Sequence, residues 1–352
     1  MVSRRQILAV AGPAAAWMAS SSKSQAWQAP VKPRMGGAPT AFSVRMQAAR
    51  RGGKPFDMIE HCHGIGLAGV QTNPPSIDAE AIKKFRERVE GYQMHLISDP
   101  RLPRQESDVA AFDAQVKAYK EAGALFFHAA MTGRRYEDFD SLDAFKKMFE
   151  QAQKSVELAE PVLRKHKVRL GIENHKGWRS AEQVAWLKRL GSEWVGVCLD
   201  LGNNLSLCED PTETVRVLGP HTLYAHIKDM AVEEYEDGFL LSEVPMGEGM
   251  LDLKQIVATL RERNPNMIFD LENITRDPLK IPVFTTKYWA TFDDAYSPLP
   301  GRDLAKVLGL VRKNRPKKPL PRITGLSPEE QIQREDENNR KCIEYARQNL
   351  AL

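Results

Sequence analysis

Short apolar runs recur along the chain after about residue 40, and amphipathic segments separate them. This alternation is typical of βα units, in which helices join parallel strands. The runs predict eight strands: Ala41–Met46, Ala68–Thr72, Met94–Ser98, Ala124–Ala129, Val168–Glu173, Val195–Asp200, Leu223–Lys228 and Met267–Glu272. Eight strands favour an α/β fold of the closed (β/α)8 TIM barrel type, with a doubly wound open sheet as the alternative.

The segments between the runs have helical periodicity. Residues 77–92 and 141–166 place apolar residues three and four positions apart among charged ones, and Ser141 is a suitable N-cap. A Gly-rich turn and a helix are expected within 247–264. We therefore expect the barrel to span residues 40–314, with residues 315–352 as a C-terminal extension wrapping it.

The N-terminus has the pattern of an export signal. Arg4-Arg5 precedes an apolar run from Ile7 to Ala19 and a stretch of small residues that ends at Ala26. This pattern resembles a twin-arginine signal peptide at residues 1–26, followed by a linker at 27–39. The apolar run is shorter than the roughly 20 residues that cross a bilayer. We expect a cleaved signal, no permanent membrane span, and a periplasmic or secreted protein.

Composition narrows the classes of partner. Hydrophobic residues make up 42% of the chain and charged residues 27%, as in ordinary globular proteins. Removing residues 1–26 takes away three basic residues and no acidic one, which leaves 47 Lys and Arg against 46 Asp and Glu. This balance argues against nucleic acid as a partner. Composition does not decide whether the protein forms a homo-oligomer. The four cysteines form no CxxC pair, and Cys198 is expected in the core.

Four successive predicted strands end in groups that bind metals. GIENHKG supplies Glu173, CLDLGN supplies Asp200, HIKD supplies His226 and DLEN supplies Glu272. In a parallel barrel the C-terminal strand ends meet at one rim, so these groups should converge. Carboxylates with one imidazole form a mixed oxygen and nitrogen set that suits Mn²⁺, Mg²⁺, Co²⁺ or Zn²⁺ with positions open for substrate.

This set suits proton transfer beside a carbonyl. A divalent ion that holds a substrate carbonyl and an adjacent hydroxyl stabilises the enediolate formed when the α-proton leaves. Glu173 and Glu272 lie on nonadjacent strands, so they can flank a sugar, with one taking the proton and the other returning it. Asp200 and His226 would then act mainly as ligands.

The motif series also resembles a known family. GIEN, CLDLGN, HIKD and DLEN, with GEGMLD between the last two, are similar in order and spacing to the xylose isomerase-like barrel superfamily, of the sugar phosphate isomerase/epimerase type. The resemblance covers about residues 40–313. It implies a divalent metal on Glu173, Asp200, His226 and Glu272, with the two glutamates able to move protons. The chain departs from the ketose 3-epimerases of this group at Asn203, where they have histidine, and at Val232, where they have arginine.

Residues beside these strand ends are candidates for substrate binding: His128, His175, Asn203, Lys228 and Trp178. His128 should touch substrate or metal, or else hold a ligand through a hydrogen bond. Lys228 either polarises a sugar oxygen or forms a salt bridge. Trp178 either stacks on a sugar ring or packs in the core. His175 and Lys176 follow Glu173 so closely that their directions stay open.

These observations predict a divalent-metal-dependent isomerase or epimerase acting on a small carbohydrate. The alternative is a lyase or hydratase acting on 3-keto-glycosides or related oxidised sugars, because the first proton abstraction is the same. A third hypothesis is a carbohydrate-binding barrel without turnover, which the four metal-binding groups disfavour.

Overall fold

The computed structural model describes residues 35–352. The expected signal peptide, residues 1–26, and most of the expected linker lie outside the described residues. No described helix combines the length and the apolar character that a membrane crossing requires.

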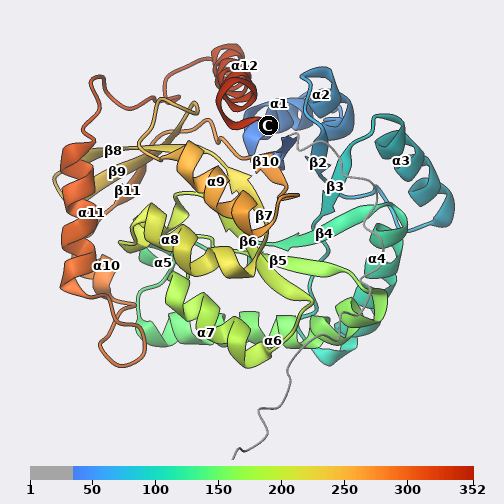
Figure 1. The fold of residues 1–352 in the computed structure, drawn as a ribbon, viewed down its shortest axis with the longest axis horizontal. Coiled ribbons are helices and arrows are strands. Elements are labelled where there is room, and N and C mark those ends of the chain that lie inside the picture. Colours follow the sequence, from blue (N-terminus) through green and yellow to red (C-terminus); the bar gives the residue numbers. More distant parts are fainter. Residues whose placement is uncertain (1–34) are drawn as a thin grey trace, which may run out of the picture. The chain divides into compact units, whose positions relative to one another are not determined.

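Eight parallel strands close into a barrel in the order β1-β10-β7-β6-β5-β4-β3-β2 (Figure 1). The strands are β1 Gly36–Gly37, β2 Gly69–Gln71, β3 His95–Ser98, β4 Ala124–Ala129, β5 Arg169–Glu173, β6 Val195–Asp200, β7 Thr222–Ile227 and β10 Phe269–Leu271. The last seven lie within two residues of the predicted ranges, so the prediction of a TIM barrel is confirmed.

The predicted first strand is wrong. Ala41–Met46 lies in the 3₁₀ turn Pro39–Phe42 and in helix α1, Ser43–Arg51, whereas the true strand is the pair Gly36–Gly37. Inside the barrel, Nε2 of His95 lies 2.7 Å from Oδ1 of Asp270. A Cβ atom at Gly36 would collide with both side chains. Glycine is required in this strand because polar side chains from other strands already fill the interior there. A strand made of glycine has no apolar side chains, so a search for apolar runs does not find it.

Helices surround the barrel (Figure 1). They are α2 Met58–Gly64, α3 Ala79–Gly91, α4 Val109–Glu121, α6 Leu142–His166, α7 Ser180–Leu190, α8 Pro211–Leu218 and α9 Leu253–Arg263, with the short α5 Arg135–Asp138 and α10 Thr286–Trp289. Ser141 caps α6 as predicted, since its side chain accepts a hydrogen bond from the Ala144 N–H at 3.2 Å.

A small antiparallel sheet follows β7 and was not predicted. It consists of the hairpin β8 Asp229–Tyr235 and β9 Gly238–Val244, with β11 Leu279–Ile281 paired to β9. Helix α11, Gly301–Lys313, lies alongside this sheet (Figure 1). Because β8 begins two residues after the end of β7, the hairpin extends directly from the barrel strand that carries His226.

The C-terminal residues return to the beginning of the described chain. Helix α12, Pro328–Tyr345, packs against α1 (Figure 1). The Glu335 carboxylate accepts hydrogen bonds from the main-chain N–H groups of Val44 at 2.7 Å and Arg45 at 3.1 Å. It thereby caps the first turn of α1, whose own N-cap residue Phe42 provides no side-chain hydrogen bond.

Candidate active site and metal centre

The four predicted ligands lie on four adjacent strands of the barrel. Glu173 ends β5, Asp200 ends β6, His226 lies on β7, and Glu272 directly follows β10. All four side chains are buried. Glu173, Asp200 and His226 each bring one ligand atom to within 4.8 Å of the other two. Oε2 of Glu272 lies 3.2 Å from Nδ1 of His226.

Two of the ligand atoms lack a hydrogen-bond partner. Oδ1 of Asp200 and Nδ1 of His226 are buried and form no hydrogen bond in the described chain, although Nδ1 faces the Glu272 carboxylate oxygen 3.2 Å away. Buried polar atoms without partners are rare in native proteins, and a bound ion is one explanation for them. The donor set of carboxylate oxygens and one imidazole nitrogen also suits a hard or borderline divalent cation. The residues present therefore fit a metal ion.

Gln71 fixes the orientation of the histidine ligand. Its Oε1 lies 2.8 Å from Nε2 of His226, and its Nε2 donates to Oδ1 of Asp99 at 2.8 Å. Because the amide oxygen can only accept, Nε2 of His226 carries a proton, and Nδ1 is the atom that faces the other ligands. A ligating histidine is commonly held by such a partner on its other nitrogen. Burial opposes a charge on His226, but Cys198 and Glu272 raise its pKa well above the ordinary value, so an ion bound at Nδ1 would displace a proton.

His128 holds the Glu173 carboxylate. Its Nε2 lies 3.0 Å from Oε2 of Glu173, and its Nδ1 lies 2.6 Å from Oδ1 of Asp99. Burial opposes a charge on His128, but hydrogen bonds to Asp99, Cys198 and Glu173 raise its pKa well above the ordinary value. Burial raises the pKa of Glu173, yet the hydrogen bond from His128 leads the effects that lower it to about 2. Glu173 is therefore an ionised carboxylate at neutral pH.

Lys228 forms buried ion pairs with two of the ligands. Its Nζ lies 2.7 Å from Oδ2 of Asp200 and 3.3 Å from Oε2 of Glu272. Burial opposes the charge of Lys228, but the two carboxylates raise its pKa. Burial raises the pKa of Glu272, and the charges of Lys228 and His226 outweigh it, so that this pKa falls well below its ordinary value. The salt-bridge interpretation of Lys228 is thus the one observed.

Asn203 links the ligands to a second lysine. Its Nδ2 donates to Oδ2 of Asp200 and, at 3.3 Å, to Oε1 of Glu173. Its Oδ1 accepts a hydrogen bond from Nζ of Lys176 at 2.6 Å. Lys176 therefore points toward the ligands. His175 is instead bonded to a loop, since its Nδ1 lies 2.6 Å from the main-chain oxygen of Thr132.

Trp178 lies in a packing position. Its side chain is fully buried and packs against Phe149 and Trp186, with ring centroids 5.3 Å and 5.0 Å away. These two residues lie on α6 and α7, so the indole belongs to the apolar layer between helices and barrel. These contacts favour the core-packing interpretation of this residue over sugar stacking.

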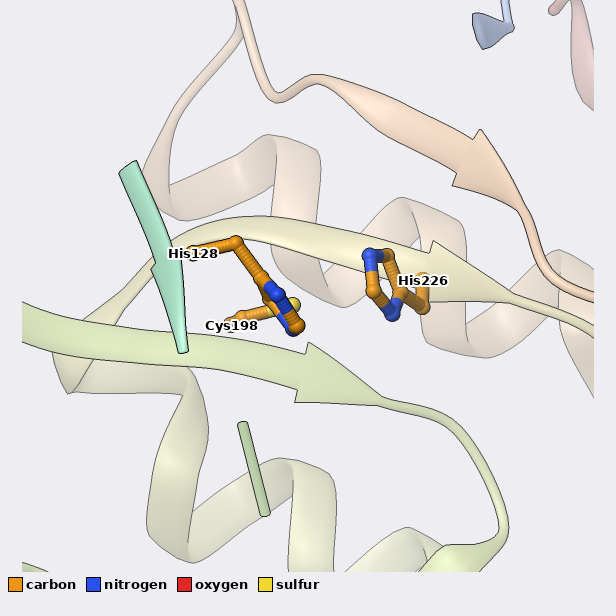
Figure 2. Close-up of side chains that lie close together, drawn as sticks. All are labelled: His128, Cys198 and His226. Carbon is orange, nitrogen blue, oxygen red and sulfur yellow. The ribbon is translucent and has the colours of Figure 1, made fainter. Parts of the chain in front are cut away.

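A second group of possible ligands lies beside the first. Figure 2 shows the side chains of His128, Cys198 and His226 converging from β4, β6 and β7. One ligand atom from each lies within 4.8 Å of the other two, and the imidazole centroids are 5.1 Å apart. Burial raises the pKa of the Cys198 thiol, but the two imidazoles outweigh it and lower that pKa. Cys198 is buried as predicted, yet it faces imidazoles rather than an apolar core alone.

A cavity of about 650 Å³ reaches the site at His128. Its lining combines polar and apolar side chains, among them Asp99, Arg101, Leu102, His128, Met131 and Met148. The volume lies in the range of ordinary small-molecule sites. Because His128 contacts Glu173 on its other side, the cavity approaches the ligands from the β3 and β4 side of the barrel.

Sequence reasoning missed Gln71 and Asp99, although both carry a signal. Each is a polar residue at or just after the end of an apolar strand, as the four ligands are. The same rule, applied to strands two and three, would have named them as rim residues. It would not have shown that they bond to each other and to the two histidines.

The fold and the site together define a TIM barrel with a candidate divalent-metal centre at its C-terminal rim. A family model described as xylose isomerase-like TIM barrel matches residues 48–285, and the chain belongs to this family. This confirms the family that the strand-end motifs indicate.

Individual relatives are distant. The chain is 31% identical over 114 residues to a 3-oxo-isoapionate decarboxylase of Pectobacterium atrosepticum, and the match spans 31% of this chain and 42% of that relative. A crystal structure of D-psicose 3-epimerase in the presence of D-fructose is similar with a TM-score of 0.56 and 14% identity, over 91% of this chain and 100% of the other. A 3-keto-D-glucoside 4-epimerase from E. coli gives a TM-score of 0.51 and 11% identity, over 80% of this chain and 100% of the other. The structural similarities at these identities concern the fold.

Proposed function

We propose that the protein is a divalent-metal-dependent isomerase or epimerase of small sugars, which moves a proton at a carbon next to a carbonyl. The observation that carries the proposal is the arrangement of Glu173 and Glu272 around Asp200 and His226, two of whose ligand atoms are buried without partners. A metal ion held by these four residues would supply Lewis-acid stabilisation of charge on the substrate oxygens.

The chain's own residues provide the base. Glu173, with a pKa of about 2, is ionised at neutral pH and can accept a proton. His128 holds this carboxylate in position and also contacts Asp99, which lines the cavity. A proton taken by Glu173 can therefore return to the substrate, or pass through His128 toward the cavity. Glu272 is the second carboxylate at the site. It is the candidate to return a proton to the opposite face of the substrate.

The structural similarity to two sugar epimerases is consistent with this reaction but concerns the fold. The proposal therefore depends on the site residues. A non-catalytic sugar-binding barrel has no evident need for buried carboxylates and an imidazole whose metal-binding atoms form no hydrogen bonds.

The test is hydrogen exchange with solvent. Protein loaded with Mn²⁺ is incubated in D₂O with a panel of neutral ketoses, 3-keto-glucosides and keto sugar acids, and deuterium at the carbon next to the carbonyl is measured by NMR for each. We expect incorporation that is lost on chelation, and a loss of about 10²- to 10⁴-fold in Glu173→Gln or Glu272→Gln. Glu157→Gln, at an exposed position of α6, is the matched control and should exchange like the parent protein. Exchange that survives chelation and both site variants would contradict the proposal.

A second candidate is a lyase acting on an oxidised sugar, which reaches the same kind of enolate either by proton abstraction, after which a β-substituent leaves, or directly by loss of CO₂ from a keto acid. The partial match to a 3-oxo-isoapionate decarboxylase favours this class. Products separate these reactions: an epimerase keeps the carbon skeleton and the glycosidic bond, an eliminating lyase releases an aglycone or water, and a decarboxylase releases CO₂.

A further inference from the structure

Lys176 differs from the other buried cations of the protein. Four Lys or Arg side chains are buried among residues 35–352: Arg135, Lys176, Arg179 and Lys228. Three of them lie within hydrogen-bonding distance of a carboxylate, at 3.1 Å for Arg135 and Glu182, 2.7 Å for Arg179 and Asp303, and 2.7 Å for Lys228 and Asp200. Within the described chain, no carboxylate oxygen lies within 4.0 Å of Nζ of Lys176.

The ammonium group of Lys176 has unused donors. It makes one hydrogen bond, to Oδ1 of Asn203 at 2.6 Å, and the side chain is 2% exposed. An ammonium carries three N–H donors, so two have no partner in the described chain. A buried charge without a counter-ion is strongly unfavourable, and proteins rarely keep one unless a ligand supplies the opposite charge.

The surroundings do not neutralise this charge. After burial itself, the strongest influences on Lys176 come from Lys228, Glu243, Arg276 and Asp200, which are two cations and two anions. Glu243 and Arg276 are already paired with each other at 2.7 Å, and Asp200 is paired with Lys228. Burial and the nearby Lys228 lower the pKa of Lys176 to about 8, so the group still carries its proton at neutral pH.

The position of Lys176 connects it to the candidate active site. Asn203, its hydrogen-bond acceptor, donates to Asp200 and to Glu173. One amide side chain therefore separates the ammonium from two of the candidate metal ligands. An anionic group bound to Lys176 would belong to a molecule that also reaches those ligands.

We propose that Lys176 binds a carboxylate of the substrate, and that the substrate class is a keto sugar acid rather than a neutral keto sugar. This inference rests on the proposed function and narrows it. One unpaired cation next to a neutral amide matches a single negative charge, which favours a carboxylate over the dianionic phosphate of a sugar phosphate.

The experiment compares unreactive ligands that differ in charge. Full-length protein loaded with Mn²⁺ is titrated calorimetrically with D-gluconate, with its neutral analogue D-sorbitol, and with sorbitol 6-phosphate. We expect D-gluconate to bind about 10- to 100-fold more tightly than D-sorbitol, as for one charged hydrogen bond. Lys176→Met should remove that preference and leave the affinity for D-sorbitol unchanged, and Lys176→Arg should restore part of it. Lys188→Met, at an exposed position of α7, is the control.

The first measurement needs no variant, so poor folding of Lys176→Met does not prevent a decision. Equal binding of D-gluconate and D-sorbitol to the parent protein would overturn the inference, as would tighter binding of the phosphate ester. A Lys176→Met protein that loses affinity for both ligands equally would do the same. If neutral ketoses exchange deuterium as well as keto acids do, the proposed function stands and this inference fails. If D-gluconate binds through Lys176 but no keto sugar exchanges, the carboxylate site stands and the proposed function fails.

Discussion

Oε1 of Gln71 lies 2.8 Å from Nε2 of His226, which joins a residue of the second barrel strand to a metal ligand on the seventh. The same amide donates to Asp99, which in turn bonds to His128 and so to Glu173. A continuous hydrogen-bonded chain thus connects two candidate ligands through residues that would not themselves bind the metal.

This series of hydrogen bonds predicts that Gln71→Leu weakens metal binding without unfolding the protein. The variant removes the group that holds the His226 proton on Nε2, so the imidazole can present the wrong tautomer to the ion. We expect Mn²⁺ affinity to fall about 10- to 100-fold, measured by calorimetry. Asn266→Leu, which changes an amide at an exposed position before β10, is the control, and an unchanged Mn²⁺ affinity in Gln71→Leu would contradict the role assigned to Gln71.

The ion pairs of Lys228 predict that stability and metal binding are linked. Lys228→Met leaves Asp200 and Glu272 as buried carboxylates without their cation, and the metal-free protein should lose about 3–5 kcal/mol of unfolding free energy. Saturating Mn²⁺ would supply positive charge at the same carboxylates, so the loss should shrink. Thermal unfolding with and without Mn²⁺ measures both effects. Equal destabilisation in the two conditions would rule out this linkage.

The Glu335 carboxyl predicts a pH-dependent stability. Burial leads the effects that raise its pKa from 4.5 to about 7, although two main-chain hydrogen bonds oppose the rise. The folded state then binds more protons than the unfolded state between these two values, so this group's contribution to stability falls as the pH rises from about 4.5 to 7.

Glu335→Gln removes that titration and keeps an acceptor for the α1 N–H groups. We expect the variant to match the parent at pH 4 and to exceed its unfolding free energy by up to about 3 kcal/mol at pH 8. Chemical denaturation at both pH values measures the difference. Glu344→Gln, exposed on the same helix, should show no such change, and a pH-independent difference in Glu335→Gln would refute the assignment.

The burial of Trp178 predicts a stability effect without a specific effect on catalysis. Trp178→Ala should cost about 3–5 kcal/mol because it leaves a cavity between Phe149 and Trp186. Below the melting temperature, Mn²⁺ affinity and the deuterium exchange rate should stay close to the parent values. A selective rise in KM without loss of stability would revive the sugar-stacking hypothesis.

The cluster in Figure 2 predicts sensitivity to thiophilic ions. Cd²⁺ prefers sulfur and nitrogen ligands, so binding to His128, Cys198 and His226 would draw His226 away from the carboxylates. We expect Cd²⁺ to inhibit deuterium exchange at Mn²⁺ concentrations that otherwise support it, and Cys198→Ser to relieve the inhibition. Cys62→Ser, which changes a buried cysteine outside this cluster, should leave the inhibition intact.

Much of the barrel and its rim could be predicted because both depend on local patterns. Apolar runs located seven strands, and the polar residue at each strand end located the four candidate ligands. The first strand escaped because Gly36 and Gly37 have no side chains to form a pattern. The β8–β9 hairpin carried only a weak signal, since its two loop residues are Glu236-Asp237 and Gly238 already begins β9.

The contacts within the site were less accessible to sequence reasoning. The directions of His175 and Lys176 depend on how the loop after β5 turns, and one side chain bonds to Thr132 while the other bonds to Asn203. Whether Trp178 stacks on a sugar or packs in the core depends on the loop after β5. That loop could place the indole at the mouth of the barrel or between the strands and the outer helices. These outcomes follow from three-dimensional packing between elements far apart in the chain.

The cap that Glu335 places on α1 joins residues 291 positions apart. Helix α1 follows the first barrel strand, and its first turn is capped by a side chain that the ribosome adds some 290 residues later. A nascent chain at that stage can form its inner βα units but must leave the start of α1 uncapped. Final assembly of this protein is therefore a late event, completed only after α12 has emerged from the ribosome.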